Sequence, residues 1–173
     1  MSDTKNGAGV DHRTASLERT TRETRITLMV NLDGQGNHEI ETDIGFLDHM
    51  ISQIARHGLF DINLQGHGDN TGSHHLVEDV AIMLGRAFDE ALGDRRGIRR
   101  MGHAYVSLDE VLVRVVVDLS GRGYACVDTT LTDASMLGGT PPLLPGTEIR
   151  HFLERLAIDG KMNLNAKVLE GEN

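Results

Sequence analysis

An internal repeat is the feature of this sequence that most restricts its fold. The runs RITLMV and LVRVVV are apolar and β-branched, and each leads into a glycine turn. This pattern is typical of a buried strand that enters a hairpin. Six positions match at a constant offset of 87 residues: Glu23, Val30, Asn31, Leu32, Gly34 and Gly36 correspond to Glu110, Val117, Asp118, Leu119, Gly121 and Gly123. Each copy is therefore expected to contain a strand and a turn.

A second matching block follows at an offset of 102 residues. The segments FLDHMISQIARHG and TEIRHFLERLAIDG have apolar residues at helical spacing and finish at a glycine suited to a helix C-cap. The matched positions are His49, Ala55, Gly58 and Asn63 with His151, Ala157, Gly160 and Asn165. Each copy is expected to continue as a helix and then a strand. The larger offset reflects an insertion around LTDASMLGGTPPLLPG, whose glycines and prolines predict a surface loop.

The two copies differ after their last matching turns, at residues 68–70 and 171–173. After the first turn, SHHLVEDVAIMLGRAFDEALGD predicts an amphipathic helix of about five turns. After the second turn the sequence stops, so we expect a C-terminally truncated form of a longer protein. We expect one compact unit with a disordered tail over residues 1–15, a first half-domain over 16–94 and an incomplete second half-domain over 95–173.

Charge and hydropathy exclude several classes of partner. The chain has 26 acidic residues against 17 Lys and Arg, a net charge of −9, and no basic cluster that could follow a phosphate backbone. No apolar run approaches the roughly 18 to 20 residues that span a bilayer, and the N-terminus has no signal-like apolar region. We expect a cytoplasmic protein that binds neither nucleic acid nor membrane. The single cysteine, Cys126, is expected to be a packed, inert strand thiol.

The strongest chemical pattern is His74, His75 and Glu78 at the start of the predicted long helix. Residues three or four apart share a helix face, so either histidine could bind one metal ion together with Glu78. Adjacent residues diverge by about 100°, so the two histidines would serve different ions, or an ion and a substrate. Imidazole and carboxylate together suit Mn, Fe, Zn or Ni. The alternative is a solvated histidine pair at a helix N-terminus, where acidic residues complement the dipole.

The repeat favours the metal-binding alternative, because His49 and His151 occupy equivalent positions on two predicted helices. Three further residues are candidates for substrate contacts: Arg100 in GDRRGIRRMG, Arg122 in DLSGRG and Glu23 before a strand. Arginines in glycine-rich turns can present a bidentate fork to a phosphate or carboxylate, although such arginines are more often solvated. Glu23 could act as a general acid or base or simply face water.

The combination of motifs resembles the imidazoleglycerol-phosphate dehydratase family of histidine biosynthesis. The matching segments run from about residue 19 to residue 173: RTTRET, IGFLDHM, HGLFDI, HHLVEDV with LGRAFDEALGDRRGI, LDE, VDLSGR, RHFLERLA and GEN. The resemblance implies an α+β fold of two pseudo-repeated halves. Each half would be a four-stranded, mostly antiparallel sheet backed by two helices, and the second half would lack its last helix.

The same resemblance implies a reaction, a cofactor and an assembly. The reaction is the dehydration of D-erythro-imidazoleglycerol phosphate to imidazole-acetol phosphate by a metal-dependent hydro-lyase. Two manganese ions would bind between neighbouring subunits of a 24-subunit shell built from trimers. The implied metal ligands are His49, His74, His75, Glu78 and His151. Arg100 and Arg122 would contact the phosphate, Glu23 the substrate, and Glu23, His75 and Glu78 would be the catalytic residues.

One departure from the family separates two hypotheses. Family members follow the second turn with another His-His-x-x-Glu helix and a phosphate-binding lysine, and this sequence does not contain that segment. The alternative hypothesis is therefore an inactive or assembly-impaired fragment with residual metal binding. A third hypothesis, an unrelated metal-dependent hydrolase, would require an open site with a single metal ion.

Overall fold

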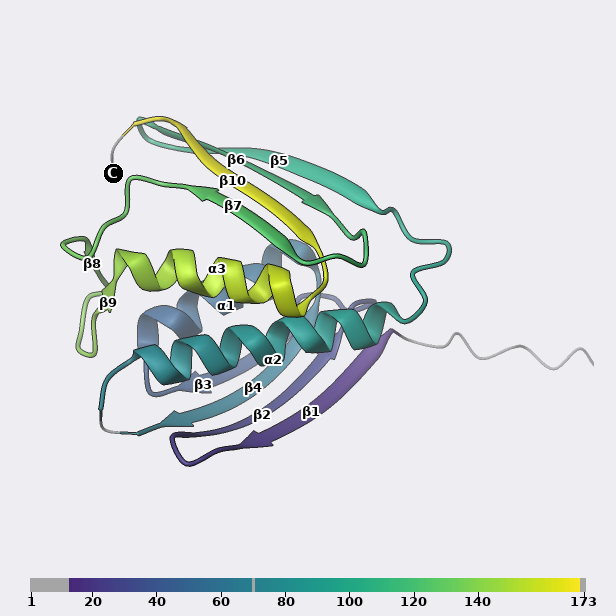
Figure 1. Cartoon of the computed structure of the whole chain (residues 1–173), viewed down its shortest axis with the longest axis horizontal. Helices are drawn as coiled ribbons and strands as arrows, with labels where there is room; N and C mark the ends of the chain where they lie inside the picture. The colour runs from purple at the N-terminus through teal and green to yellow at the C-terminus, as the bar shows by residue number, and fades with distance from the viewer. Residues whose placement is uncertain (1–12, 70, 172–173) are drawn as a thin grey trace, which may run out of the picture.

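In the part of the chain that the structure describes, two four-stranded sheets form the outer layers and three helices lie between them (Figure 1). The computed structural model describes residues 13–69 and 71–171. Buried aliphatic side chains of the first sheet and of all three helices form one continuous core between the sheets. The α+β architecture with two similar halves, predicted from the repeat and the family resemblance, is confirmed.

The first half contains the sheet β1-β2-β4-β3 and two helices. Strand β2 is antiparallel to both of its neighbours, β1 and β4, and β3 is parallel to β4. Helix α2 packs on β1, β2 and β4, while α1 packs on β3 and β4. The elements are β1 (Thr14–Thr20), β2 (Thr24–Asn31), β3 (His38–Thr42), α1 (Gly45–Gly58), β4 (Asp61–Gly68) and α2 (His74–Leu92).

The second half repeats this strand order as β5-β6-β10-β7, again with one parallel pair at the edge. Helix α3 packs on β7 and β10. The bounds of β6 and β10 differ from those of β2 and β4 by the offsets of 87 and 102 seen in the sequence. The elements are β5 (Met101–Leu108), β6 (Val111–Asp118), β7 (Tyr124–Asp128), β8 (Met136–Leu137), β9 (Leu144–Pro145), α3 (Gly146–Asp159) and β10 (Asn163–Glu170).

Three local expectations need correction. The glycine turn after β2 does not close a hairpin, because β2 already has β1 and β4 as neighbours and β3 pairs only with β4. Strand β1 begins at Thr14, with Ala15 only 4% exposed, so the ordered half-domain starts before the expected boundary at residue 16. Residues 1–12 of the expected tail lie outside the described residues. Cys126 is in strand β7 as expected, but its side chain is exposed rather than packed.

Gly160 is the C-cap of α3 as predicted, whereas the C-cap of α1 is Leu59 rather than Gly58, and neither glycine adopts the left-handed conformation. The left-handed residues are Leu59 and Lys161, with φ of 56° and 47°, each one position after the glycine. A Cβ at Gly160 would lie 2.7 Å from the Leu156 carbonyl oxygen, so this position needs the space. Gly85 of α2 shows the same constraint, since its Cβ would lie 2.8 Å from the Gly160 nitrogen. Glycines therefore let the backbones of α2 and α3 approach closely.

The second sheet is less completely covered than the first. All eight residues of β5 are exposed, and Val106 and Leu108 are exposed by 63% and 73%. An apolar hollow of about 570 Å³ lies between this sheet and the helices, lined in part by Phe88, Val117 and Leu164. The expectation that the second half has one helix fewer than the first is met within the described residues.

Candidate metal centre between the second and third helices

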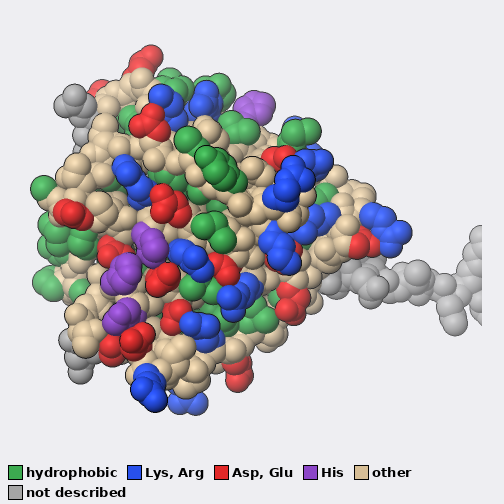
Figure 2. All heavy atoms as spheres, in the orientation of Figure 1, with side chains coloured by type: hydrophobic (Ala, Val, Ile, Leu, Met, Phe, Trp, Pro, Cys, Tyr) green, Lys and Arg blue, Asp and Glu red, His purple; other side chains and the backbone are tan. Residues whose placement is uncertain are grey.

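The N-terminal turns of α2 and the facing side of α3 bring three of the predicted metal ligands together. One ligand atom each from His74, Glu78 and His151 lies within 4.8 Å of the other two. His74 and Glu78 are four residues apart and share a face of α2, whereas His151 comes from the middle of α3. The space-filling view shows histidines gathered with acidic and basic side chains on one face of the molecule (Figure 2).

The geometry of these three side chains fits a divalent cation. His151 Nε2 is 3.4 Å from Glu78 Oε1, and the rings of His74 and His151 stack with centroids 5.0 Å apart. His151 Nε2 is buried, and no described residue forms a hydrogen bond with it. A buried ring nitrogen without a hydrogen bond, next to a carboxylate, is a natural coordination position. Two imidazoles and a carboxylate suit Mn, Fe, Zn or Ni better than Ca or Mg.

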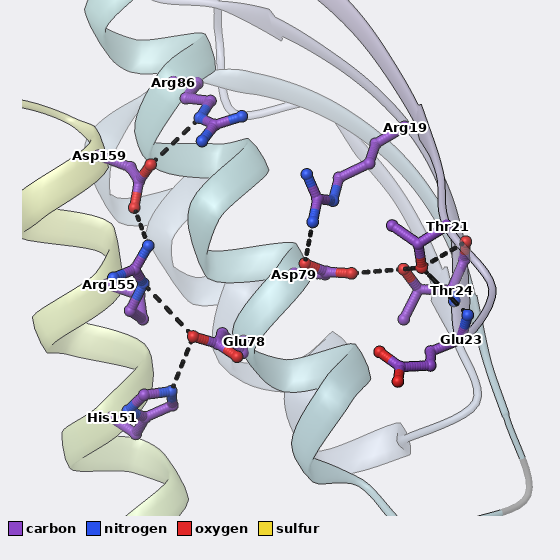
Figure 3. Close-up of polar contacts among 10 residues, drawn as sticks. All are labelled: Arg19, Thr21, Glu23, Thr24, Glu78, Asp79, Arg86, His151, Arg155 and Asp159. Atoms are coloured by element: carbon purple, nitrogen blue, oxygen red, sulfur yellow. Dashed lines mark hydrogen bonds and ion pairs between the residues drawn. The ribbon is translucent and has the colours of Figure 1, made fainter.

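Charged residues on both helices hold Glu78 in place. Arg155 Nε of α3 is 3.6 Å from Glu78 Oε1, and its guanidinium also pairs with Asp159 at 2.8 Å. Asp159 in turn accepts a hydrogen bond from Arg86 Nε of α2 at 3.1 Å. Figure 3 shows these residues as a continuous row from Arg86 to His151 along the contact between the two helices. The row fixes the carboxylate of Glu78 on the side of α2 that faces α3.

The structure separates the other two predicted metal ligands from this cluster. The side chain of His75 points to a different partner, with Nδ1 3.4 Å from Asp69 Oδ2. A hydrogen bond from Thr71 Oγ1 lowers the pKa of Asp69. His49 is exposed on α1 and does not belong to the three-residue group. Of the two spacings left open by the sequence, the structure joins His74 rather than His75 to Glu78.

Glu23 lies in the turn between β1 and β2, on the other side of α2. Asp79 fixes this turn to the helix: Thr24 Oγ1 donates to its carboxylate at 2.5 Å, and Arg19 forms an ion pair with it at 3.0 Å. Consecutive residues Glu78 and Asp79 therefore point to opposite sides of α2, as Figure 3 shows. This role of Asp79 was not predicted from the sequence. An acidic residue directly before the buried Val80 was the available signal.

Arg100 and Arg122 lie near the opposite end of α2 from the metal cluster. Arg100 forms a two-pronged ion pair with Asp118, at 2.5 and 2.9 Å, which lowers the pKa of that carboxyl group and raises the pKa of the guanidinium. The positive charge of exposed Arg122 also lowers the pKa of Asp118. Helix α2 alone rises about 27 Å over its 19 residues, so one chain does not place these arginines next to His74.

Two other residues near the cluster were not found from the sequence. Glu148, in the first turn of α3, contacts His74 Nδ1 with both carboxylate oxygens, at 3.1 and 3.2 Å. Arg155 is the second, through its contact with Glu78. Neither has a charged counterpart at the matching position of α1, where the chain has Phe46 and Gln53.

None of the described helices is both long and apolar enough to cross a membrane.

Comparison with known proteins agrees with the fold and the motifs. The family model for imidazoleglycerol-phosphate dehydratase matches residues 42–173. The curated imidazoleglycerol-phosphate dehydratase of Dehalococcoides mccartyi is 52% identical over 161 residues, covering 93% of this chain and 79% of the relative. That of a Roseiflexus species is also 52% identical, over 164 residues and with the same coverage.

Solved structures extend the comparison to the fold. Imidazoleglycerol-phosphate dehydratase from Staphylococcus aureus superposes with a TM-score of 0.77 at 27% identity, covering 92% of this chain and 86% of that one. The Pyrococcus furiosus enzyme, solved in complex with (S)-C348, gives a TM-score of 0.74 at 32% identity and covers 91% and 81%. Sequence and structure thus agree along nearly the whole chain, which belongs to the imidazoleglycerol-phosphate dehydratase family.

Proposed function

We propose that this chain dehydrates D-erythro-imidazoleglycerol phosphate to imidazole-acetol phosphate in histidine biosynthesis, as a metal-dependent hydro-lyase. The observation that carries the proposal is the His74, Glu78 and His151 cluster, found in a chain 52% identical to a curated enzyme of that name. Because the substrate is phosphorylated and does not cross membranes freely, the cytoplasm is the compartment we propose.

The proposed cofactor is manganese, with two ions in a complete site. His74, Glu78 and His151 would hold one ion, and His49 and His75 would contribute to the second. When bound, manganese acts as a Lewis acid and places positive charge beside the imidazole ring of the substrate. The mixed nitrogen and oxygen donors of the cluster support this choice, although the same donors also suit iron or zinc.

The reaction also requires groups that transfer protons and groups that bind the substrate. Dehydration breaks the C–O bond on the carbon beside the ring and a C–H bond on the next carbon, and the resulting enol tautomerises to the ketone. One group must therefore accept a proton, and another must assist the departing hydroxyl. We propose Glu23, with His75 and Glu78, for these roles. The clamp of Asp79 on Thr24 keeps the turn that carries Glu23 against α2, which supports this assignment.

Arg100 and Arg122 would bind the substrate phosphate and so orient a small molecule by its strongest charge. Their distance from the metal cluster in one chain supports a site completed by a second copy. Such a site agrees with the 24-subunit shell of trimers that we propose for the assembly.

The decisive experiment is a turnover assay of this chain with manganese and substrate, together with measurement of bound metal. We expect turnover in the wild-type chain and its loss in His75→Ala. Arg100→Met should raise KM while metal affinity stays unchanged, because Arg100 is remote from the cluster. A wild-type chain that binds manganese and substrate but shows no turnover would favour the inactive-fragment hypothesis.

A further inference from the structure

We propose that Glu148 is a positioning residue of the metal centre, which orients His74 by accepting a hydrogen bond from its Nδ1–H. This inference rests on the proposed metal site and adds a residue that neither the sequence motifs nor the ligand set includes. Glu148 Oε1 and Oε2 lie 3.1 and 3.2 Å from His74 Nδ1. The two residues belong to different helices and are 74 positions apart in the sequence, so only tertiary packing brings them together.

Burial makes this contact more than a surface pair. The side chain of Glu148 is 14% exposed, whereas that of His74 is 55% exposed. The carboxylate is therefore the fixed partner, and the more exposed imidazole is the group that it restrains. Glu148 is in the first turn of α3, where the helix dipole stabilises a negative charge. The ring of His74, held in this way, stacks on His151 at an interplanar angle of 26°.

The chemistry of the two groups determines which one donates the hydrogen bond. A carboxylate can only accept hydrogen bonds, so His74 Nδ1 must carry the proton. A neutral imidazole has one N–H, which leaves the lone pair of Nε2 for a metal ion. Losing a hydrogen-bond partner of this kind typically weakens metal affinity by about 10- to 100-fold.

The second histidine of the pair has a carboxylate of its own, which supports the assignment. His75 Nδ1 is 3.4 Å from Asp69, so each of the adjacent histidines has a separate acidic partner on Nδ1. The two carboxylates come from different elements, Asp69 from the loop before α2 and Glu148 from α3. This arrangement holds the two rings at an interplanar angle of 60°.

Manganese binding tests the proposal without any need for turnover. Free manganese would be measured by electron paramagnetic resonance during titration of the wild-type chain, Glu148→Met, Glu148→Gln and Glu154→Met. Glu154 is the matched control, since it is a carboxylate on the same helix and its side chain makes no hydrogen bond or ion pair with the described residues. Thermal unfolding without metal would show that the variants fold alike.

We expect Glu148→Met to weaken manganese affinity by about 10- to 100-fold, and Glu154→Met to leave it unchanged. Glu148→Gln should stay within about threefold of wild type, because its amide oxygen still accepts from Nδ1–H. In the zinc-loaded protein, nitrogen NMR should show His74 protonated at Nδ1.

The contrary outcomes are distinct. Equal binding by wild type and Glu148→Met would overturn the role of Glu148 and leave the metal site standing. If Glu148→Gln were as weak as Glu148→Met, the carboxylate would act as a ligand or by charge, and positioning would be refuted. Absence of manganese binding by the wild-type chain would remove the metal site and this inference together.

Discussion

The two halves of the molecule share a strand order but differ in what covers their sheets. The first sheet is packed by α1 and α2, and Val30 of its central strand β2 is fully buried. The matching residue of the second sheet, Val117 of β6, is only partly buried and lines the apolar hollow. Strand order is the same in both halves, and the register also matches except for a shift between Val168 and Glu170 of β10. The comparison shows that strand order follows the repeated pattern, while burial depends on the helices supplied to each sheet.

The same asymmetry distinguishes the functional residues. His151 of α3 faces α2 and joins the metal cluster, whereas its equivalent His49 of α1 is exposed and outside the cluster. The difference arises because α2 and α3 cross closely at Gly85 and Gly160, with no side chain between their backbones. Equivalent sequence positions thus acquire different roles when only one of them faces a partner helix.

The largest expected effect separates these two histidines. In chains kept dilute enough to remain monomeric, His151→Asn should weaken manganese affinity by about 100-fold or more, because it removes a ligand rather than a supporting group. His49→Asn should have no effect under those conditions. Titration calorimetry, with sedimentation to establish the monomer, would measure both. A loss of affinity in monomeric His49→Asn would show that the two helices are functionally equivalent after all.

A smaller effect concerns the cores of the two halves. Val30→Ala should lower the free energy of unfolding by about 2 kcal/mol, since it removes methyl groups from a fully packed position. Val117→Ala should cost about 1 kcal/mol or less, because its surroundings are already partly open. Urea unfolding of both variants provides the comparison. Equal losses would mean that the second sheet is as well covered as the first.

The smallest effect distinguishes the two matching turns by their pH dependence. In the first half, backbone N–H groups of Gln35 and Asn37 donate to Asp61, each at 2.9 Å, and lower the pKa of its carboxyl group. In the second half the matching residue is Asn163, whose amide donates to Ser120 Oγ and the Arg122 carbonyl oxygen.

Because the pKa of Asp61 is lower in the folded chain, its stabilisation is complete above the ordinary carboxyl range, near pH 4, and is lost as pH falls through the lowered value. The amide proton shifts of Gln35 and Asn37 should therefore change as the pH falls through the lowered pKa of Asp61. The amide proton shift of Arg122 should show no corresponding change due to Asn163, because the side chain of Asn163 does not titrate. Asp61→Asn should abolish the movement of the first pair. A persistent shift in that variant would assign the effect to another group.

Several parts of the fold and site could be predicted from the sequence because they depend on local pattern. Apolar spacing predicted each of the three helices found in the described residues, and the repeat predicted that a strand follows α1 and α3. The four-residue spacing of His74 and Glu78 allowed a shared metal on geometric grounds. The hairpin after β2 was predicted wrongly, because β4 rather than β3 pairs with the second edge of β2. The residues of the turn itself do not indicate which distant strand pairs with β2.

The sequence by itself determined the two-half organisation, the family and the candidate ligands, since these rest on periodicity, spacing and motif. Only the tertiary structure decided that His74 rather than His75 faces Glu78 and His151. It also decided that Glu148 restrains His74 and that Asp79 fixes the turn of Glu23. The physical reason is the packing of α2 between α3 and the first sheet, which sends adjacent residues of one helix to different partners.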